Sequence, residues 1–187
     1  INYEPDGTIV LSQRGHIVKI LERFGMQQCK TSSVPAINDD REREKQQELP
    51  KEFPYRSAIG SLMYVAMGTR PDLSYVVSVL SSYLDCPKMC DWNAFKRVLR
   101  YLKATQEYGL RYTPKKTDQP LEIFCDSDWA GDTTDRKSRT GLFALCYGNV
   151  ISWVSRKQST VSLSSTESEF IAISEGVKEG LALRKLL

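Results

Sequence analysis

Residues 121–157 read LEIFCDSDWAGDTTDRKSRTGLFALCYGNVISWVSRK, and their pattern predicts the architecture of the second half of the chain. Short apolar runs, rich in branched and aromatic residues, lie at 121–126, 140–147 and 150–157, with turn residues between them, which is typical of β-strands. The dipeptide Gly148-Asn149 predicts the second turn. We therefore expect a three-stranded antiparallel meander, followed by a long helix at 167–187 that packs on it.

The first half of the chain shows the helical period instead, with apolar residues three and four positions apart. The predicted elements are a strand at 7–13, helices at 14–25, 55–67, 71–84 and 91–104, and a strand at 109–114. The charged stretch 38–51 has almost no large apolar residues and predicts a solvated linker. The expected fold class is therefore α+β, with a strand and helix and then a helical unit before the meander.

Composition permits many functions and excludes few. Of 187 residues, 41% are hydrophobic and 26% are charged, which is ordinary for a globular protein. The net charge of +3 allows a polyanionic partner without requiring one. No apolar run approaches the roughly 18 residues of a membrane span, and the N-terminal sequence resembles neither a signal nor a transit peptide. We expect no membrane partner and no secretion.

Acidic residues gather where the first strand of the meander ends, in the stretch CDSDWAGD at 125–132. Asp126 follows a hydrophobic run, where burial disfavours a charged carboxylate unless a cation neutralises it. Glu167 lies in the first turn of the final helix, which could bring it beside Asp126 if the helix crosses the sheet. Oxygen ligands without nearby histidine or cysteine favour Mg²⁺, or Mn²⁺ as a substitute.

A structural role explains the same acids equally simply. Ser164 and Glu167 fit the capping box S-x-x-E, as do Thr166 and Glu169, and acidic side chains stabilise the start of a helix. On spacing alone the capping interpretation is favoured over the metal interpretation. The other acids of this region are most simply turn residues: Asp128, Asp132 and Asp135.

Basic residues cluster in two places, where they could hold phosphate groups. The first set lies in the predicted hairpins and comprises Arg136, Lys137, Arg139, Arg156 and Lys157. The second set lies on the helix predicted at 91–104 and comprises Lys96, Arg97, Arg100 and Lys103. Solvated surface charge explains either set at least as simply as nucleic-acid binding does.

Several long motifs follow one another in an order that resembles the C-terminal part of the Pol polyprotein of copia-type LTR retrotransposons. TIVLSQ and HIVKILERFGMQQCKTSSVPA, at 8–13 and 16–36, resemble the end of its reverse transcriptase domain. YRSAIGSLMYVAMGTRPDLSYVVSVLS and FKRVLRYLKAT resemble its thumb and connection region. CDSDWAGDTTDRKSRTG, ISWVSRKQSTVSLSSTESEF and EGVKEGLALRKLL resemble the start of its ribonuclease H (RNase H) domain. The resemblance covers nearly the whole chain.

The resemblance implies four segments: the end of reverse transcriptase at 1–37, a charged linker at 38–53, a helical thumb and connection region at 54–113, and the N-terminal half of an RNase H-like domain at 120–187. It implies that the parent protein copies element RNA into DNA and cleaves the RNA strand of an RNA/DNA hybrid. By motif, Asp126 matches the first catalytic Asp and Glu167 the catalytic Glu, both as ligands of Mg²⁺. Glu169 is less favoured as the second ligand, because it lies about 200° round the helix from Glu167.

The implied partners are the RNA/DNA hybrid and the remainder of the Pol polyprotein. The implied location is the cytoplasm, in the virus-like particle of the element, and the resemblance also allows nuclear import of the parent complex.

The sequence departs from the family pattern in two respects. The YxDD-type polymerase motif is missing, so we expect no polymerase activity. The later RNase H carboxylates are missing too, so it stays open whether the chain is an enzyme by itself, and an inactive fragment is favoured. The missing RNase H strands belong to the same sheet, so the first meander strand should expose an edge. Gly176 and Gly180 each cost a helix about 1 kcal/mol relative to alanine, which suggests a decayed element. The alternative function is a non-enzymatic retroelement remnant that at most binds nucleic acid.

Overall fold

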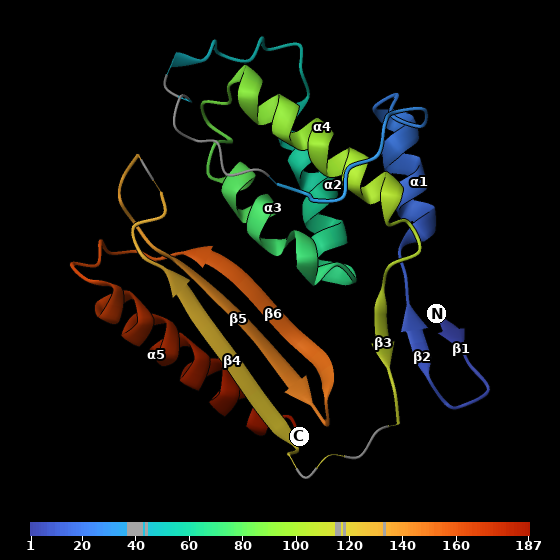
Figure 1. Cartoon of the computed structure of the whole chain (residues 1–187), viewed down its shortest axis with the longest axis vertical. Coiled ribbons are helices and arrows are strands. Elements are labelled where there is room, and N and C mark those ends of the chain that lie inside the picture. The colour runs from blue at the N-terminus through green and yellow to red at the C-terminus, as the bar shows by residue number, and fades with distance from the viewer. Residues whose placement is uncertain (37–42, 44, 115–116, 118, 133) are drawn as a thin grey trace. The chain divides into compact units, whose positions relative to one another are not determined.

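The computed structural model describes residues 1–36, 43, 45–114, 117, 119–132 and 134–187. These residues form an α+β structure, as predicted, which divides into two compact units (Figure 1). One unit comprises residues 11–110 and the other comprises residues 1–10 with 111–187. The elements in chain order are β1 (Asn2–Tyr3), β2 (Ile9–Leu11), α1 (Arg14–Arg23), α2 (Tyr55–Gly68), the 3₁₀-helix η2 (Pro71–Leu73), α3 (Ser74–Ser81), α4 (Met89–Ala104), β3 (Leu110–Tyr112), β4 (Leu121–Asp128), β5 (Arg139–Cys146), β6 (Asn149–Lys157) and α5 (Ser165–Arg184).

The helical unit, residues 11–110, is built around one apolar core. In α1 the buried residues are Ile17, Ile20 and Leu21, the spacing that predicted an amphipathic helix. In α4 the Trp92 and Phe95 rings lie 4.9 Å apart at the centre of an aromatic cluster. α2, η2 and α3 contribute further core positions, together with Leu49 before α2. The predicted helices of this half are confirmed, with ends that differ by a few residues.

One predicted helix, 71–84, is divided into two elements. The residues from Pro71 to Leu73 form a 3₁₀ turn, closed by a hydrogen bond of 3.1 Å from the Leu73 N–H to the Arg70 carbonyl. The regular helix α3 begins at Ser74 and ends at Ser81. Proline explains this start, because it has no N–H to donate in the first turn.

A buried arginine joins the end of α2 to the end of α4. The Arg70 side chain is 1% exposed, and its Nη2 and Nε donate to the Asp72 carboxylate at 2.7 and 3.0 Å. It also donates to the Thr105 carbonyl and hydroxyl at 2.9 and 2.7 Å. Burial alone would raise the pKa of Asp72, but the hydrogen bonds from Arg70 and Tyr101 outweigh it and lower that pKa below its ordinary value.

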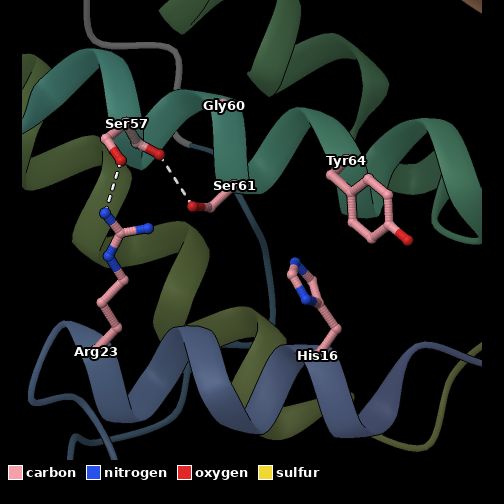
Figure 2. Close-up of a pocket in the computed structure, with 6 residues that line it drawn as sticks. All are labelled: His16, Arg23, Ser57, Gly60, Ser61 and Tyr64. Carbon is pink, nitrogen blue, oxygen red and sulfur yellow. Dashed lines mark hydrogen bonds between the residues drawn. The ribbon is translucent and has the colours of Figure 1, made fainter.

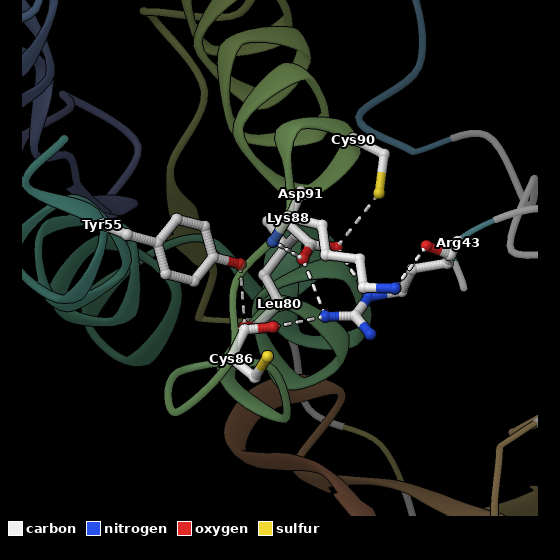
Figure 3. A network of polar contacts seen from close by, with 7 residues as sticks. All are labelled: Arg43, Tyr55, Leu80, Cys86, Lys88, Cys90 and Asp91. Carbon is white, nitrogen blue, oxygen red and sulfur yellow. Dashed lines mark hydrogen bonds and ion pairs between the residues drawn. The ribbon is translucent and has the colours of Figure 1, made fainter. Parts of the chain in front are cut away.

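A second ion pair holds residue 43 against the start of α4 (Figure 3). The Arg43 guanidinium donates to both oxygens of Asp91, at 3.1 and 2.9 Å, and to the Cys86 carbonyl at 2.9 Å. Asp91 also accepts the Lys88 N–H at 2.7 Å, which caps α4. Most of the segment 37–44 lies outside the described residues. Within this segment Arg43 is described. Its side chain is only 15% exposed, so this residue differs from the solvated linker that the sequence predicts.

The second unit contains the predicted antiparallel meander, in the order β4-β5-β6. The register places Phe124 opposite Phe143, and Phe143 opposite Trp153. The second turn is formed by Tyr147 and Gly148, with φ of 46° and 79°. Positive φ at both positions is the type I′ geometry of two-residue hairpins. The predicted Gly148-Asn149 turn was therefore wrong by one residue.

Helix α5 packs along one face of this sheet, mainly over β4 (Figure 1). A Cβ added at Gly176 would lie 3.2 Å from the Cys125 sulfur, and one at Gly180 would lie 3.3 Å from the Ile123 side chain. The two glycines therefore permit close packing, which replaces their interpretation as signs of decay. The other edge of β4 has no partner strand among the described residues, as expected.

The small sheet has the order β1-β2-β3. β1 and β2 form an antiparallel hairpin that pairs Asn2 with Val10 and Tyr3 with Ile9. In the described ranges, no helix has both the length and the apolar character that crossing a membrane would require.

Candidate functional site

Asp126 lies on the open face of the meander, two residues before the end of β4. Side chains alternate between the faces of a strand, and the neighbouring Ser127 faces α5, where its hydroxyl donates to Ser168 at 2.9 Å. Asp126 therefore projects from the face that α5 leaves uncovered. It is exposed, and among the described residues its carboxylate has no hydrogen-bond or ion-pair partner. Its cross-strand neighbour is Gly141, so no side chain fills the space beside it.

The next two acids of the stretch form hydrogen bonds within the hairpin that joins β4 to β5. Asp128 accepts a hydrogen bond from the Arg139 N–H across the hairpin. A Cβ at Gly131 would collide with the Asp128 carboxylate, so this close approach requires glycine. Asp132 is buried and accepts the Thr134 N–H at 2.9 Å. Asp132 therefore lies in the loop, as predicted, whereas Asp128, predicted as a turn residue, is the last residue of β4.

Lys157 at the end of β6 is held by two acids of the same loop. Its Nζ lies 2.5 Å from the Asp132 carboxylate and 3.0 Å from that of Asp135. Burial alone would lower the pKa of Lys157, but these contacts outweigh it and raise that pKa. Burial alone would raise the pKa of Asp132, but Lys157 and the Thr134 N–H lower it. The charge of Lys157 is thus neutralised within the protein.

We expect the Asp132 contact to stabilise the sheet unit in a pH-dependent way. Because the pKa of Asp132 is lowered by folding, its contribution is complete above the ordinary carboxyl value of 3.8 and is lost as pH falls through the lower folded value. Urea unfolding of wild type and Asp132→Asn should therefore differ most near neutral pH and converge in acid. A difference that is independent of pH would contradict this assignment.

Glu167 caps the start of α5. The Glu167 N–H donates to the Ser164 hydroxyl at 3.1 Å, and the Glu167 carboxylate accepts the Leu163 N–H at 2.6 Å. The capping interpretation of Ser164 and Glu167 is confirmed, with the carboxylate reaching one residue further back than in a standard box. Since α5 begins at Ser165, Thr166 lies inside the helix and is not its cap.

The two acids of the first helical turns lie on different sides of α5. Glu169 precedes Gly176 by seven residues and Gly180 by eleven, spacings that return to the same side of an α-helix. Because both glycines approach β4, Glu169 lies on the side of the helix next to β4. It is exposed and has no hydrogen-bond partner among the described residues. Glu167, about 200° away, lies on the opposite side.

The described residues do not form a complete cation site. No group of three or more histidine, cysteine, aspartate and glutamate side chains in the described part of the chain could hold a metal ion. The resemblance assigns Asp126 and Glu167 to one Mg²⁺ site. Their sequence neighbours Ser127 and Ser168 are hydrogen-bonded at 2.9 Å, whereas the Asp126 carboxylate has no partner among the described residues and the Glu167 carboxylate accepts the Leu163 N–H. Their joint role remains a prediction.

The basic residues of the hairpins do not form one patch. Arg156 lies on the α5 side of the sheet, where its Nε donates to Glu175 at 3.0 Å, whereas Lys157 is held by the loop acids. Arg139 is 7% exposed, which leaves little of its side chain for a phosphate. Arg136 is exposed and Lys137 is half-buried, and neither side chain has a partner among the described residues. These two remain the accessible members of the set.

The basic residues of α4 form a row on the helical unit. Lys96, Arg100 and Lys103 follow one another at four and three residues, which places them on one side of the helix. Lys103 donates to the Cys29 carbonyl at 2.8 Å. Arg97 projects from the neighbouring side, and its Nε is buried without a hydrogen-bond partner among the described residues.

Sequence reasoning missed an aromatic surface beside Asp126. The Phe124 and Phe143 rings are stacked 4.7 Å apart at 8° on the open face, and both are more than 40% exposed. The signal was the alternation of β4, in which Phe124 and Asp126 share a face. The sequence alone does not show which side of α5 packs on the sheet, so it could not predict that Glu169 lies on that side.

Comparisons with known proteins complete the description of the site. No protein-family model matches the chain, and no solved structure matches it. The chain is 47% identical over 133 residues to the secreted RxLR effector protein 161 of Plasmopara viticola, covering 71% of this chain and 93% of that protein. It is 39% identical to the uncharacterized mitochondrial protein AtMg00810 of Arabidopsis thaliana, covering 92% of this chain and 71% of that protein.

Transposon proteins match over almost the full chain. The retrovirus-related Pol polyprotein from transposon TNT 1-94 of Nicotiana tabacum is 39% identical over 95% of this chain, which spans 14% of that polyprotein. The polyprotein from transposon RE2 of Arabidopsis thaliana is 40% identical over 90% of this chain, which spans 12% of it. The order of the motifs and these identities agree, and the chain belongs to the family of retrovirus-related Pol polyproteins of copia-type transposons.

Proposed function

We propose that the chain acts within a transposon Pol polyprotein in reverse transcription, and that residues 120–187 contribute to RNase H cleavage of the RNA strand of an RNA/DNA hybrid. The observation that carries this proposal is the state of Asp126. Of the three acids in CDSDWAGD, Asp128 and Asp132 are bound within the protein, whereas Asp126 is exposed and free. An unpaired carboxylate at an open strand end is available to a ligand.

The second acid of this proposed site comes from α5. The motif assigns Glu167, but the Glu167 carboxylate already accepts the Leu163 N–H. Glu169 is exposed and has no partner among the described residues, so it is the alternative acid that α5 offers to the site. In either case a Mg²⁺ site in the parent would need acids in addition to those described here, because two carboxylates hold such an ion weakly.

The proposed substrate contact lies at the same end of the sheet. Arg136 and Lys137 belong to the loop that joins β4 to β5, and Asp126 lies two residues from the end of β4. These two cations would bind backbone phosphates of the hybrid and hold its RNA strand next to the acidic residues. The cytoplasmic location predicted for the parent follows from this role and remains a prediction.

Substitution of Asp126 tests the proposal directly. We expect Asp126→Asn, in a Pol polyprotein that contains this chain, to lower cleavage of a labelled RNA/DNA hybrid by at least about tenfold, because the amide keeps the shape and loses the charge. Matched variants Glu167→Gln and Glu169→Gln identify the partner, since only the functional acid should reproduce the loss. Unchanged cleavage by Asp126→Asn would reject the assignment.

The alternative, a remnant that only binds nucleic acid, is favoured by the incomplete cation site and by the row of Lys96, Arg100 and Lys103. It predicts binding that weakens steeply with salt and shows no sequence preference. The chain itself would then bind hybrid without cleaving it, with Mg²⁺ or Mn²⁺ present, and Asp126→Asn would change nothing.

A further inference from the structure

A pocket of about 450 Å³ lies between α1 and α2 in the helical unit (Figure 2). Its lining consists of His16 and Arg23 from α1, and Ser57, Gly60, Ser61 and Tyr64 from α2. Its volume falls within the range of small-molecule sites, about 300–1,000 Å³. No catalytic role was assigned to any of these residues, so the pocket is independent of the function proposed for the meander.

One end of the pocket is aromatic and contains a polar atom without a partner. The imidazole of His16 points from α1 toward α2 and meets the Tyr64 ring edge-on, with 4.8 Å between ring centroids (Figure 2). The Nε2 atom of His16 is buried and has no hydrogen-bond partner among the described residues. Buried polar atoms are nearly always satisfied, and His16, which lines the pocket, has unused hydrogen-bonding capacity at this nitrogen.

The other end is cationic and rich in hydroxyl groups. The Arg23 Nη2 donates to the Ser57 hydroxyl at 2.7 Å, and the Ser61 hydroxyl donates to the Ser57 carbonyl at 2.9 Å. Among the described residues Arg23 forms no ion pair, and the lining contains no carboxylate. A guanidinium with free donors beside hydroxyl groups suits a phosphate, which it can bind through two parallel hydrogen bonds.

The two ends are separated by a distance that fits one nucleotide better than a bare phosphate. Arg23 follows His16 by seven residues on α1, which is about 10 Å along the helix axis. Between them Gly60 leaves the wall open, since a Cβ there would have no atom within 4 Å. Aromatic side chains such as Tyr64 provide a surface on which any base can stack.

We propose that this pocket binds a nucleotide, with its phosphate on Arg23 and Ser57 and its base against His16 and Tyr64. The nucleotide is either free or part of a single strand, and both present the same phosphate and base. The site is formed by α1 and α2 alone and does not require Asp126.

The experiment uses the full chain, with adenosine monophosphate, a short single-stranded oligonucleotide and inorganic phosphate as probes. His16 is the one histidine of the sequence, so its imidazole signals in a proton NMR spectrum need no further assignment. We expect adenosine monophosphate to shift these signals and Arg23→Gln to weaken its binding at least about tenfold. Arg14→Gln is the matched control, because Arg14 is on the same helix, outside the pocket, and pairs with Glu107 at 2.6 Å.

Gly60→Leu separates binding from folding. Leucine is a better helix former than glycine, and its side chain would occupy the open wall, so the variant should stay folded and lose binding. Tighter binding of the oligonucleotide than of adenosine monophosphate would identify a strand as the occupant, and equal binding would identify a free nucleotide. Three results would overturn the proposal: His16 signals that no nucleotide shifts, binding that Arg23→Gln or Gly60→Leu leaves intact, or inorganic phosphate binding as tightly as the nucleotide.

Discussion

Replacing Arg70 by alanine should lower the free energy of unfolding of the helical unit by about 3–5 kcal/mol. The side chain is 1% exposed, and the substitution removes its contacts with both Asp72 and Thr105. Asp72 would keep its charge in a half-buried position with the Tyr101 hydroxyl as its remaining donor. Because the Asp72 side chain is 35% exposed, most of the loss should come from the Thr105 carbonyl and hydroxyl, which lose a buried donor, and from the space that the arginine leaves. Urea unfolding followed by circular dichroism measures the loss.

An exposed arginine of the same unit is the matched control. Arg56 pairs with Asp85 at 3.3 Å, but their side chains are 73% and 100% exposed. Exposed pairs contribute between about 0 and 1 kcal/mol, so Arg56→Ala should leave the unfolding midpoint almost unchanged. If Arg70→Ala were tolerated as well as Arg56→Ala, the network around Arg70 would have no part in stability. Since domains are only marginally stable, a variant that fails to fold would agree with the expected loss.

Replacing Asp91 by alanine should cost the helical unit about 3 kcal/mol or more. Asp91 is 4% exposed and takes part in two interactions: it caps α4, and it forms the ion pair with Arg43. Alanine would leave the Lys88 N–H without its acceptor and the Arg43 guanidinium without its counter-ion. The same urea unfolding experiment measures this loss.

The variant Asp91→Asn separates the two contributions. Asparagine can still accept the Lys88 N–H but carries no charge, so it should retain the cap and lose the ion pair with Arg43. We expect its stability to lie between those of the wild type and Asp91→Ala. Equal stability of Asp91→Asn and the wild type would show that the ion pair contributes nothing, and Asp91→Ala would then report the cap alone.

Local patterns were sufficient to predict most of the elements. The spacing of Ile17, Ile20 and Leu21 predicted α1, because one face of this helix is buried. A short apolar run followed by turn residues predicted β4. The hairpin turn was misplaced by one residue because Tyr147, an unusual residue at positive φ, occupies its first position. The helix predicted at 71–84 is shorter than expected, because Pro71–Leu73 form a 3₁₀ turn and α3 ends at Ser81.

The contacts that fix the candidate site and the core could not be predicted, since they join residues far apart in the sequence. Arg70 meets Thr105 across 35 positions, and Lys157 meets Asp135 across 22. The basic pair Arg156-Lys157 therefore predicted phosphate binding, although Asp132 and Asp135, in the loop between β4 and β5, neutralise Lys157. The cap at Glu167 was visible as a local motif, but the side of α5 that faces β4 follows only from how the helix docks on the sheet.

The two glycines of α5 also bear on the order in which the sheet unit folds. A helix with two interior glycines is about 2 kcal/mol less favourable than one with alanines, so α5 should have little helical structure before a surface exists to hold it. That surface is β4, which pairs with β5, and β5 in turn pairs with β6. We expect the meander to form first and α5 to dock late. In refolding, pulse-labelled hydrogen exchange should protect β5 before α5, and the reverse order would contradict this sequence of events.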